Sequence, residues 1–204
     1  IYYHGAACFK IKTNNTQLII NPFAAETGLA KRKFEGDIVL VSQQENIDAQ
    51  RVAPSSPDLK NSFIVDSPGE YEIKNVFIYG LKSDSAIIYN LKIENIGLTH
   101  LNGISRPVND QELEVIKNTD ILFIPVGGFG APAGKLADEI ISQIEPKIVI
   151  PMDYKIAGYN IAREPLANFL AEMGIKNHTE ETSLKVTAKD LPAEELKIVV
   201  LKVS

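Results

Sequence analysis

Residues 120–154 read DILFIPVGGFGAPAGKLADEIISQIEPKIVIPMDY and carry the clearest structural pattern in the chain. The run from Asp120 to Val126 is almost continuously apolar, as expected for a strand buried on both faces. Apolar residues then recur every three or four positions from Ala133 to Ile144, which predicts a helix that Pro146 ends. Lys147 to Met152 is a second buried strand. Two such strands joined by a helix form a parallel pair, so this stretch predicts an α/β layered domain.

Strand patterns dominate the residues before this stretch. Short apolar or alternating runs bounded by turn residues predict strands at 2–12, 17–21, 37–42, 63–65, 71–79, 86–93 and 96–100. The polar residues 82–85 are predicted to form a hairpin loop. Asp110 begins a predicted helix, Arg163 to Met173 is another that Gly174 ends, and Leu196 to Val203 is a final strand. No linker or repeat divides residues 1–204, which predicts one domain.

Composition excludes several classes of protein. The formal net charge is −5 and the sequence pI is about 5.3, and the densest basic cluster is only Lys31, Arg32 and Lys33, so nucleic-acid binding is not expected. No apolar run is long enough to span a membrane and no secretory leader is recognised. The single cysteine, Cys8, cannot form an internal disulfide, and we expect a cytoplasmic protein.

Six short segments stand in order along the chain: YHGAACF (3–9), NPF (21–23), DIVLVS (37–42), SPGEYEI (67–73), IPVGG (124–128) and IPMDY (150–154). Together they resemble landmarks of the UlaG-like branch of the metallo-β-lactamase superfamily, including its Asp-Pro-Phe, Gly-Pro-Gly-Glu-Tyr-Glu and Ile-Pro-Met-His-Tyr motifs. The resemblance implies a four-layer αββα sandwich, in which two mixed β-sheets pack together and helices lie outside.

The resemblance does not extend to the residues that bind metal. Enzymes of this family hold one or two metal ions with His-x-His-x-Asp-His after the third segment, and here the matching histidine positions are Gln43, Glu45 and Asp48. Gly103 lies where the bridging aspartate is expected, and Asp153 replaces the last histidine. Zinc requires imidazole, thiolate or carboxylate donors that converge on one point, so the resemblance predicts no catalytic residue, no resident metal and no cofactor.

Two functions remain open. The coordinated loss of ligands favours a non-catalytic pseudoenzyme that acts by binding an unknown protein partner or as a homo-oligomer. The alternative is a metal-dependent hydrolase in which Glu45, Asp48 and Asp153 form a reorganised carboxylate site for a hard cation such as Mg²⁺ or Ca²⁺. An enzyme requires these three carboxylates to lie close together, whereas a binding protein does not.

Three other patterns receive structural interpretations. The run Gly128–Ala133 fits Gly-x-Gly-x-x-Ala, but Pro132 removes a backbone donor that could face a phosphate, so we do not predict nucleotide binding. His4 and Cys8 are predicted to share one face of a single strand, where a buried cysteine is favoured over a catalytic pair. All three histidines, His4, His100 and His178, are interpreted as surface or packing residues.

Overall fold

The computed structural model describes residues 1–30, 32–42, 46–83, 86–128 and 134–204. Its first sheet has five strands in the order β1-β2-β3-β5-β7. The members are β1 (Tyr2–Gly5), β2 (Cys8–Lys12), β3 (Gln17–Ile20), β5 (Ile38–Leu40) and β7 (Phe63–Val65). The first two pairings are antiparallel, while β3, β5 and β7 run parallel. The sheet is therefore mixed, as expected.

The second sheet has seven strands in the order β15-β13-β12-β11-β10-β9-β8. Its strands are β8 (Gly69–Ile73), β9 (Val76–Ser83), β10 (Ala86–Ile93), β11 (Ile96–His100), β12 (Ile121–Pro125), β13 (Ile148–Met152) and β15 (Lys197–Ile198). The β8–β11 half is antiparallel and the β11–β15 half is parallel. Two small parallel pairs join β4 (Phe34–Glu35) to β6 (Val52–Ala53), and β14 (Glu180–Glu181) to β16 (Val200–Leu201).

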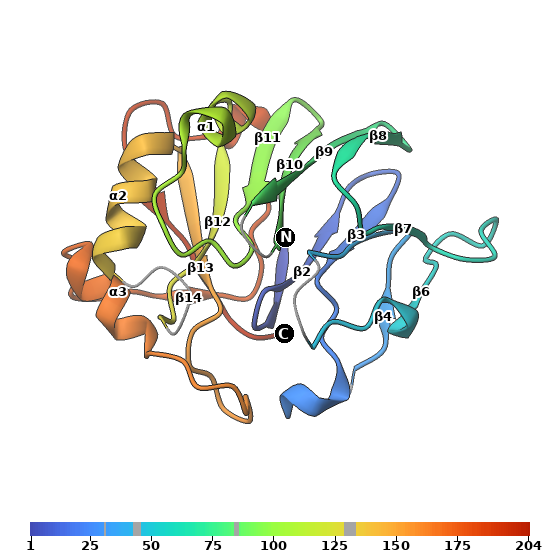
Figure 1. The fold of residues 1–204 in the computed structure, drawn as a ribbon, viewed down its shortest axis with the longest axis horizontal. Coiled ribbons are helices and arrows are strands. Elements are labelled where there is room, and N and C mark those ends of the chain that lie inside the picture. Colours follow the sequence, from blue (N-terminus) through green and yellow to red (C-terminus); the bar gives the residue numbers. More distant parts are fainter. Residues whose placement is uncertain (31, 43–45, 84–85, 129–133) are drawn as a thin grey trace.

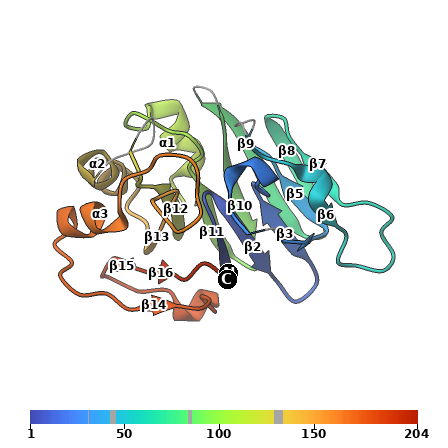
Figure 2. The ribbon, with the colours of Figure 1, turned by 90° about the horizontal axis from the view of Figure 1, so that it is seen from below.

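The main hydrophobic core lies between the two sheets, which pack face to face (Figures 1 and 2). In β3, Leu18 and Ile20 face this core and Ile19 faces outward, whereas β12 and β13 are buried on both faces because the core continues beneath the helices. The rings of Phe9 and Phe123, one from each sheet, lie 4.5 Å apart between centroids. Tyr89 adds a polar link, because its hydroxyl donates to two carbonyls of the opposite sheet. These contacts hold the two sheets in one relative position.

The α-helices all cover the seven-stranded sheet within the described ranges (Figure 2). They are α1 (Asp110–Ile116), α2 (Gly134–Ile144) and α3 (Leu166–Glu172), and α2 buries Ala137, Ile140, Ile141 and Ile144. A capping box between Asn109 and Glu112 fixes the start of α1. The outer face of the five-stranded sheet is covered instead by a second apolar cluster that includes Ile19, Phe23 and Phe34. Its covering segments include the β4–β6 pair and the short 3₁₀ turns η1 (Ala25–Thr27) and η2 (Ala49–Arg51).

Two predicted single strands are hairpins. The strand predicted over 2–12 turns at Ala6, whose φ of 51° ends β1 and lets β2 fold back, so the expectation that His4 and Cys8 share a face of one strand is wrong. The strand predicted over 71–79 turns at Lys74 and Asn75, which both have positive φ. As a result, Tyr71 and Ile73 pack against the core, whereas Phe77 points outward and is exposed.

Other boundaries shift for local reasons. The third helix begins at Leu166 instead of Arg163, because Pro165 caps it with an extended backbone. The predicted final strand divides into β15 and β16, which pair with different neighbours. The hairpin loop predicted at 82–85 is shorter, since β9 continues to Ser83, and residues 84 and 85 lie outside the described part of the chain.

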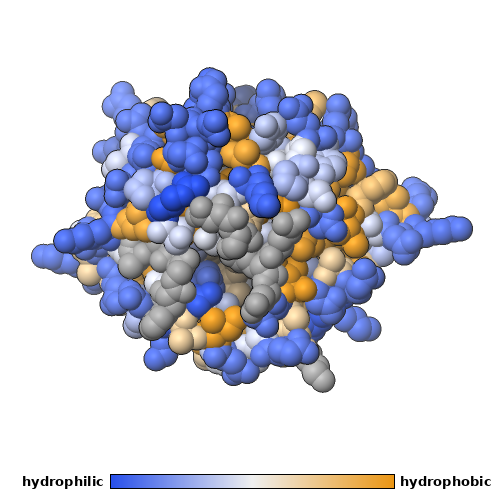
Figure 3. All heavy atoms as spheres, in the orientation of Figure 1, coloured by the Kyte–Doolittle hydropathy of each residue, from blue (hydrophilic) through white to orange (hydrophobic). Residues whose placement is uncertain are grey.

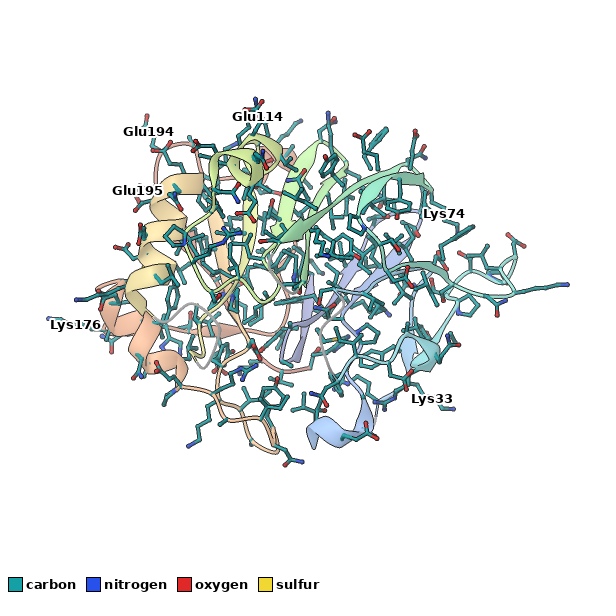
Figure 4. The ribbon with its side chains drawn as sticks, in the orientation of Figure 1. Lys33, Lys74, Glu114, Lys176, Glu194 and Glu195 are labelled. Carbon is teal, nitrogen blue, oxygen red and sulfur yellow. The ribbon has the colours of Figure 1, made fainter. Side chains whose placement is uncertain are left out.

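Charged residues occupy the periphery. Figure 4 labels six of them: Lys33, Lys74, Glu114, Lys176, Glu194 and Glu195. Lys74, in the turn between β8 and β9, also forms an ion pair with the other sheet. Its Nζ lies 3.0 Å from the buried carboxylate of Asp37, the residue before β5. In Figure 3 the rim is mostly hydrophilic and hydrophobic residues form separate groups.

Among the described residues, no helix has the length and apolar character needed to cross a bilayer.

Candidate functional site

The candidate site lies where strands of both sheets end. Asn21 follows β3, Ser42 follows β5 by two residues, Asn102 follows β11 by two and Asp153 follows β13 directly. Polar side chains at the carboxyl ends of parallel strands gather at one edge of a sheet, which is the usual position of a site in layered α/β folds. Hydrogen bonds between these residues show that the edges of the two sheets meet here.

A pair of asparagines joins the sheets at this edge. Asn21 Nδ2 donates to Asn102 Oδ1 over 2.5 Å, and Asn21 Oδ1 accepts from the backbone N–H of Ser42 at 3.0 Å. Asn102 Nδ2 in turn donates to the carbonyl of Ile87 in β10. Both asparagines are buried, and Asn21 has a φ of 48°, a conformation that asparagine tolerates better than most residues. The site therefore contains neutral amides in contact with each other.

Asp153 is held by an ion pair. One of its oxygens, Oδ2, lies 2.9 Å from Arg163 Nε, and the other accepts a hydrogen bond from the Tyr159 hydroxyl at 3.0 Å. The two charged side chains are only 13% and 16% exposed. Burial raises the pKa of the Asp153 carboxyl above its ordinary value, and the charge of Arg163 and the hydrogen bond from Tyr159 oppose that rise. Both carboxylate oxygens are thus engaged by side chains of the following loop.

That loop, residues 154–165, also ties the two halves of the site together. The N–H of Asn160 donates to the carbonyl of Thr27 in η1, and Gly28 packs so closely against Gly158 that a Cβ on Gly28 would lie 2.4 Å from its carbonyl. On the other side, the N–H of Glu164 donates to the carbonyl of Gly127 after β12. Direct contacts of the chain therefore link both sheets at the place where a shared ion could otherwise do so.

The remaining predicted positions do not complete a donor set. The Asp48 carboxylate accepts a hydrogen bond from the N–H of Gln50 and caps η2. Gly103 has a φ of 59° and supplies no side-chain donor. Gln43 and Glu45 lie outside the described residues. Within the described ranges, no three His, Cys, Asp or Glu side chains come together in a way that could hold a metal ion.

The described residues of the site do not fit the metal that the fold family implies. A divalent cation needs several lone-pair donors at about 2.0–2.6 Å. Arg163 has no lone pair to offer, and its positive charge occupies the position beside Asp153 that a cation would need. The described residues therefore do not form a metal site.

The histidines and the cysteine do not form a second site. His100 is fully buried beside Phe9 and Phe123, its Nε2 lies 3.1 Å from the carbonyl of Ala7, and burial lowers its pKa to about 4. Burial likewise lowers the pKa of His4 to about 4. Cys8 is fully buried, and burial raises the pKa of its thiol. The third histidine, at position 178, is exposed.

Sequence reasoning missed the residues that define this site. Arg163 and Tyr159 lie in a loop without a recognisable motif, so nothing local indicates their partner. Asn21 did carry an indication, because it replaces the aspartate of the Asp-Pro-Phe motif. Of the glycine-rich run at 128–133, only Gly128 lies within the described residues, with a φ of 69°.

Comparison with known proteins identifies the family and confirms the fold. Residues 1–153 match a protein family described as the beta-lactamase superfamily domain. A UPF0173 protein of Pyrococcus abyssi is 21% identical over 217 residues, which cover 94% of this chain and 95% of that protein.

Solved structures show the same fold. A candidate zinc-dependent hydrolase of the metallo-β-lactamase superfamily from Thermotoga maritima superposes with a TM-score of 0.83 at 25% identity, covering 98% of this chain and 97% of the other. A candidate metal-dependent hydrolase from Parabacteroides distasonis gives a TM-score of 0.63 at 13% identity, covering 99% and 92%.

Proposed function

Since the chain belongs to the beta-lactamase superfamily domain family, we propose that it is a non-catalytic member that acts by binding a protein partner or a second copy of itself. The observation that carries this proposal is the ion pair between Arg163 and Asp153, the residue that replaces the last family histidine. In this reading, a permanent side-chain cation has taken the place of the metal. The site then stabilises the fold and no longer activates water.

Chemistry at the other described positions supports the same reading. Metal-dependent hydrolysis needs an ion that lowers the pKa of a bound water to near 7. Asn21 and Asn102 use their amide groups on each other, on Ser42 and on Ile87, so they provide orientation and no negative charge. Neutral amides beside an internally paired carboxylate form a stable polar network and a poor environment for a divalent cation.

The alternative function, a hydrolase with a carboxylate site at Glu45, Asp48 and Asp153, would require existing contacts of Asp48 and Asp153 to break. Asp153 would have to release Arg163 and leave that guanidinium partly buried without its partner. Asp48 would have to give up its cap on η2. Two of the three proposed ligands are thus already used by the protein itself, which favours the non-catalytic function.

The proposed function also includes a cellular compartment, the cytoplasm, and a class of partner, a protein. The acidic balance of the chain argues against nucleic acid, and the single buried cysteine suits the reducing cytoplasm. We propose a protein surface as the ligand because the amide groups of Asn21 and Asn102 and both carboxylate oxygens of Asp153 already have partners within the chain.

Metal content of the purified protein tests the proposal directly. The protein is dialysed against Zn²⁺, Mn²⁺ or Mg²⁺, freed of excess ion and analysed by mass spectrometry of the elements. A relative with the intact His-x-His-x-Asp-His motif serves as the positive control. We expect far less than one ion per chain and no hydrolysis of phosphodiester, ester or β-lactam substrates. One ion per chain that disappears in Asp153→Ala would overturn the proposal and favour the hydrolase with a carboxylate site.

A further inference from the structure

The outer face of strands β8, β9 and β10 contains an exposed aromatic residue between two opposite charges. The register places Phe77 of β9 directly beside Glu72 of β8 and Lys92 of β10, and all three point away from the core. Phe77 is 50% exposed, the largest value among the exposed large hydrophobic residues of the described chain. Among described residues, neither Glu72 nor Lys92 forms an ion pair. We call the row Glu72–Phe77–Lys92 the β9 row.

The protein leaves this part of the sheet uncovered. Further along β9, the Ser83 hydroxyl donates to Glu112 of α1, so the helical layer begins there. Toward β11, the N–H of Gly97 donates to the Asp120 carboxylate, and that loop closes the other side. The half-buried Tyr79 lies next to the β9 row on the same face and extends its aromatic surface. A surface of three strands therefore remains open between the helices and the hairpin turns.

We propose that this surface is the interface of a two-fold homodimer whose axis runs along β9 through Phe77. Such an axis exchanges the two sides of the strand, so β8 of one copy faces β10 of the other. Glu72 then lies opposite Lys92 of the second copy, Lys92 lies opposite Glu72, and the two Phe77 rings meet at the centre. An axis across the strands would place β8 over β8 and bring acidic residues together. The charge pattern thus selects one arrangement.

The spacing of packed sheets allows these contacts. Neighbouring strands are about 4.8 Å apart and packed sheets about 10 Å apart, so extended Glu and Lys side chains can meet across the interface beside the aromatic centre. A buried aromatic core with a charged rim is the usual arrangement of a protein interface. Because the open surface is only three strands wide, we expect a weak dimer, with a dissociation constant on the order of 10 µM. The dimer surface is separate from the site at Asp153 and does not depend on the proposed loss of catalysis.

Sedimentation of the full-length chain over a concentration series tests the proposal. We expect a monomer–dimer equilibrium that Phe77→Ser weakens by roughly 100-fold, since two copies of a central aromatic residue are lost. Phe63→Ser is the matched control, because Phe63 is similarly exposed, at 47%, but lies on the edge strand β7. This control should leave the dissociation constant unchanged.

Charge exchange tests the axis itself. Glu72→Lys alone and Lys92→Glu alone should each weaken the dimer by about tenfold, because each brings like charges together twice. The double variant Glu72→Lys/Lys92→Glu should restore affinity to within about threefold of the original protein. All variants change exposed residues, and circular dichroism verifies that they fold. A protein that stays monomeric at high concentration, a dimer that tolerates Phe77→Ser, or a double variant without recovery would each overturn the proposal.

Discussion

Replacement of Arg163 by methionine tests whether the ion pair with Asp153 stabilises the site. The substitution keeps most of the apolar stem and removes the guanidinium, whose carbon lies 5.9 Å from the centre of the Tyr159 ring and whose Nη1 donates to the Ala162 carbonyl. Asp153 is then left partly buried with a single side-chain hydrogen bond, from Tyr159. The Asp153 carboxylate must therefore either remain ionised without a counter-charge or take up a proton.

The expected loss of stability follows from the burial of the pair. Removing one partner of a fully buried ion pair costs about 3–5 kcal/mol. Both side chains keep some contact with solvent, at 13% and 16% exposure, and we therefore expect about 2–3 kcal/mol at pH 7. For a chain of this length, that loss lowers Tm by roughly 4–12 °C.

The pH dependence separates charge from packing. Without Arg163, the pKa of Asp153 in the folded protein rises further, because burial is no longer opposed by a neighbouring cation. A raised folded pKa leaves stability intact below the unfolded value of about 3.9 and removes it as pH rises through the folded value. The difference between Arg163→Met and the original protein should accordingly be large at pH 7 and small near pH 4.

Urea unfolding at several pH values, combined with a double-mutant cycle, measures this effect. Asp153→Asn removes the buried charge, so adding Arg163→Met to it should cost about 1–3 kcal/mol less than Arg163→Met costs alone. If Arg163→Met changes the free energy of unfolding by less than about 0.5 kcal/mol, or by the same amount at every pH, the ion pair does not hold the site together.

Three further predictions concern other buried groups. Asn21→Asp should destabilise the fold by about 2–4 kcal/mol at pH 7, and by less at low pH, where a raised pKa keeps the new carboxyl neutral. Asn75→Asp, at an exposed position with the same left-handed backbone, should change the free energy of unfolding in urea only slightly. Asp37→Ala should cost about 3–5 kcal/mol, because the serine, threonine and lysine groups that donate to the Asp37 carboxylate lose their partner. Burial opposes ionisation of Asp37, but these donors hold its pKa well below the usual range. The stabilisation is therefore complete above about pH 4 and falls as acid is added, while Asp58→Ala, at an exposed position, should have almost no effect. Cys8 should react with a thiol reagent only after unfolding, and rapid labelling of the native protein would contradict its burial.

The sequence predicted the parts of the fold that depend on local periodicity. The strand–helix–strand unit around α2 was expected within a few residues, because buried strands and an amphipathic helix leave a clear pattern over short distances. The hairpins at Ala6 and at Lys74 were missed, since each interrupts a run of strand-forming residues without the usual turn pair. The helix predicted from Arg163 begins at Leu166 instead, because Pro165 disfavours a helical backbone at the residue before it and is itself extended.

In the sequence, the candidate site is indicated by the absence of the family's metal ligands and not by the residues that replace them. Sequence motifs located Asp153 correctly at the end of a strand, because the motif Ile-Pro-Met precedes it. Its partner Arg163 could not be predicted, since it is ten residues away in a loop and the contact depends on how that loop folds back over η1. The Asn21–Asn102 contact joins two sheets across 81 residues and likewise exists only in three dimensions.

The replacements share one electrostatic logic. A metal site gathers negative groups whose mutual repulsion is offset by the charge of the ion, so its carboxylates become costly once the ion is lost. In this chain one acidic position of the family is the neutral Asn21, and Asp153, which replaces a histidine ligand, is neutralised by Arg163. Each change alone would leave either a buried charge or an unpaired amide. Together they give a site whose charges are balanced without an ion, which is consistent with the proposed non-catalytic function.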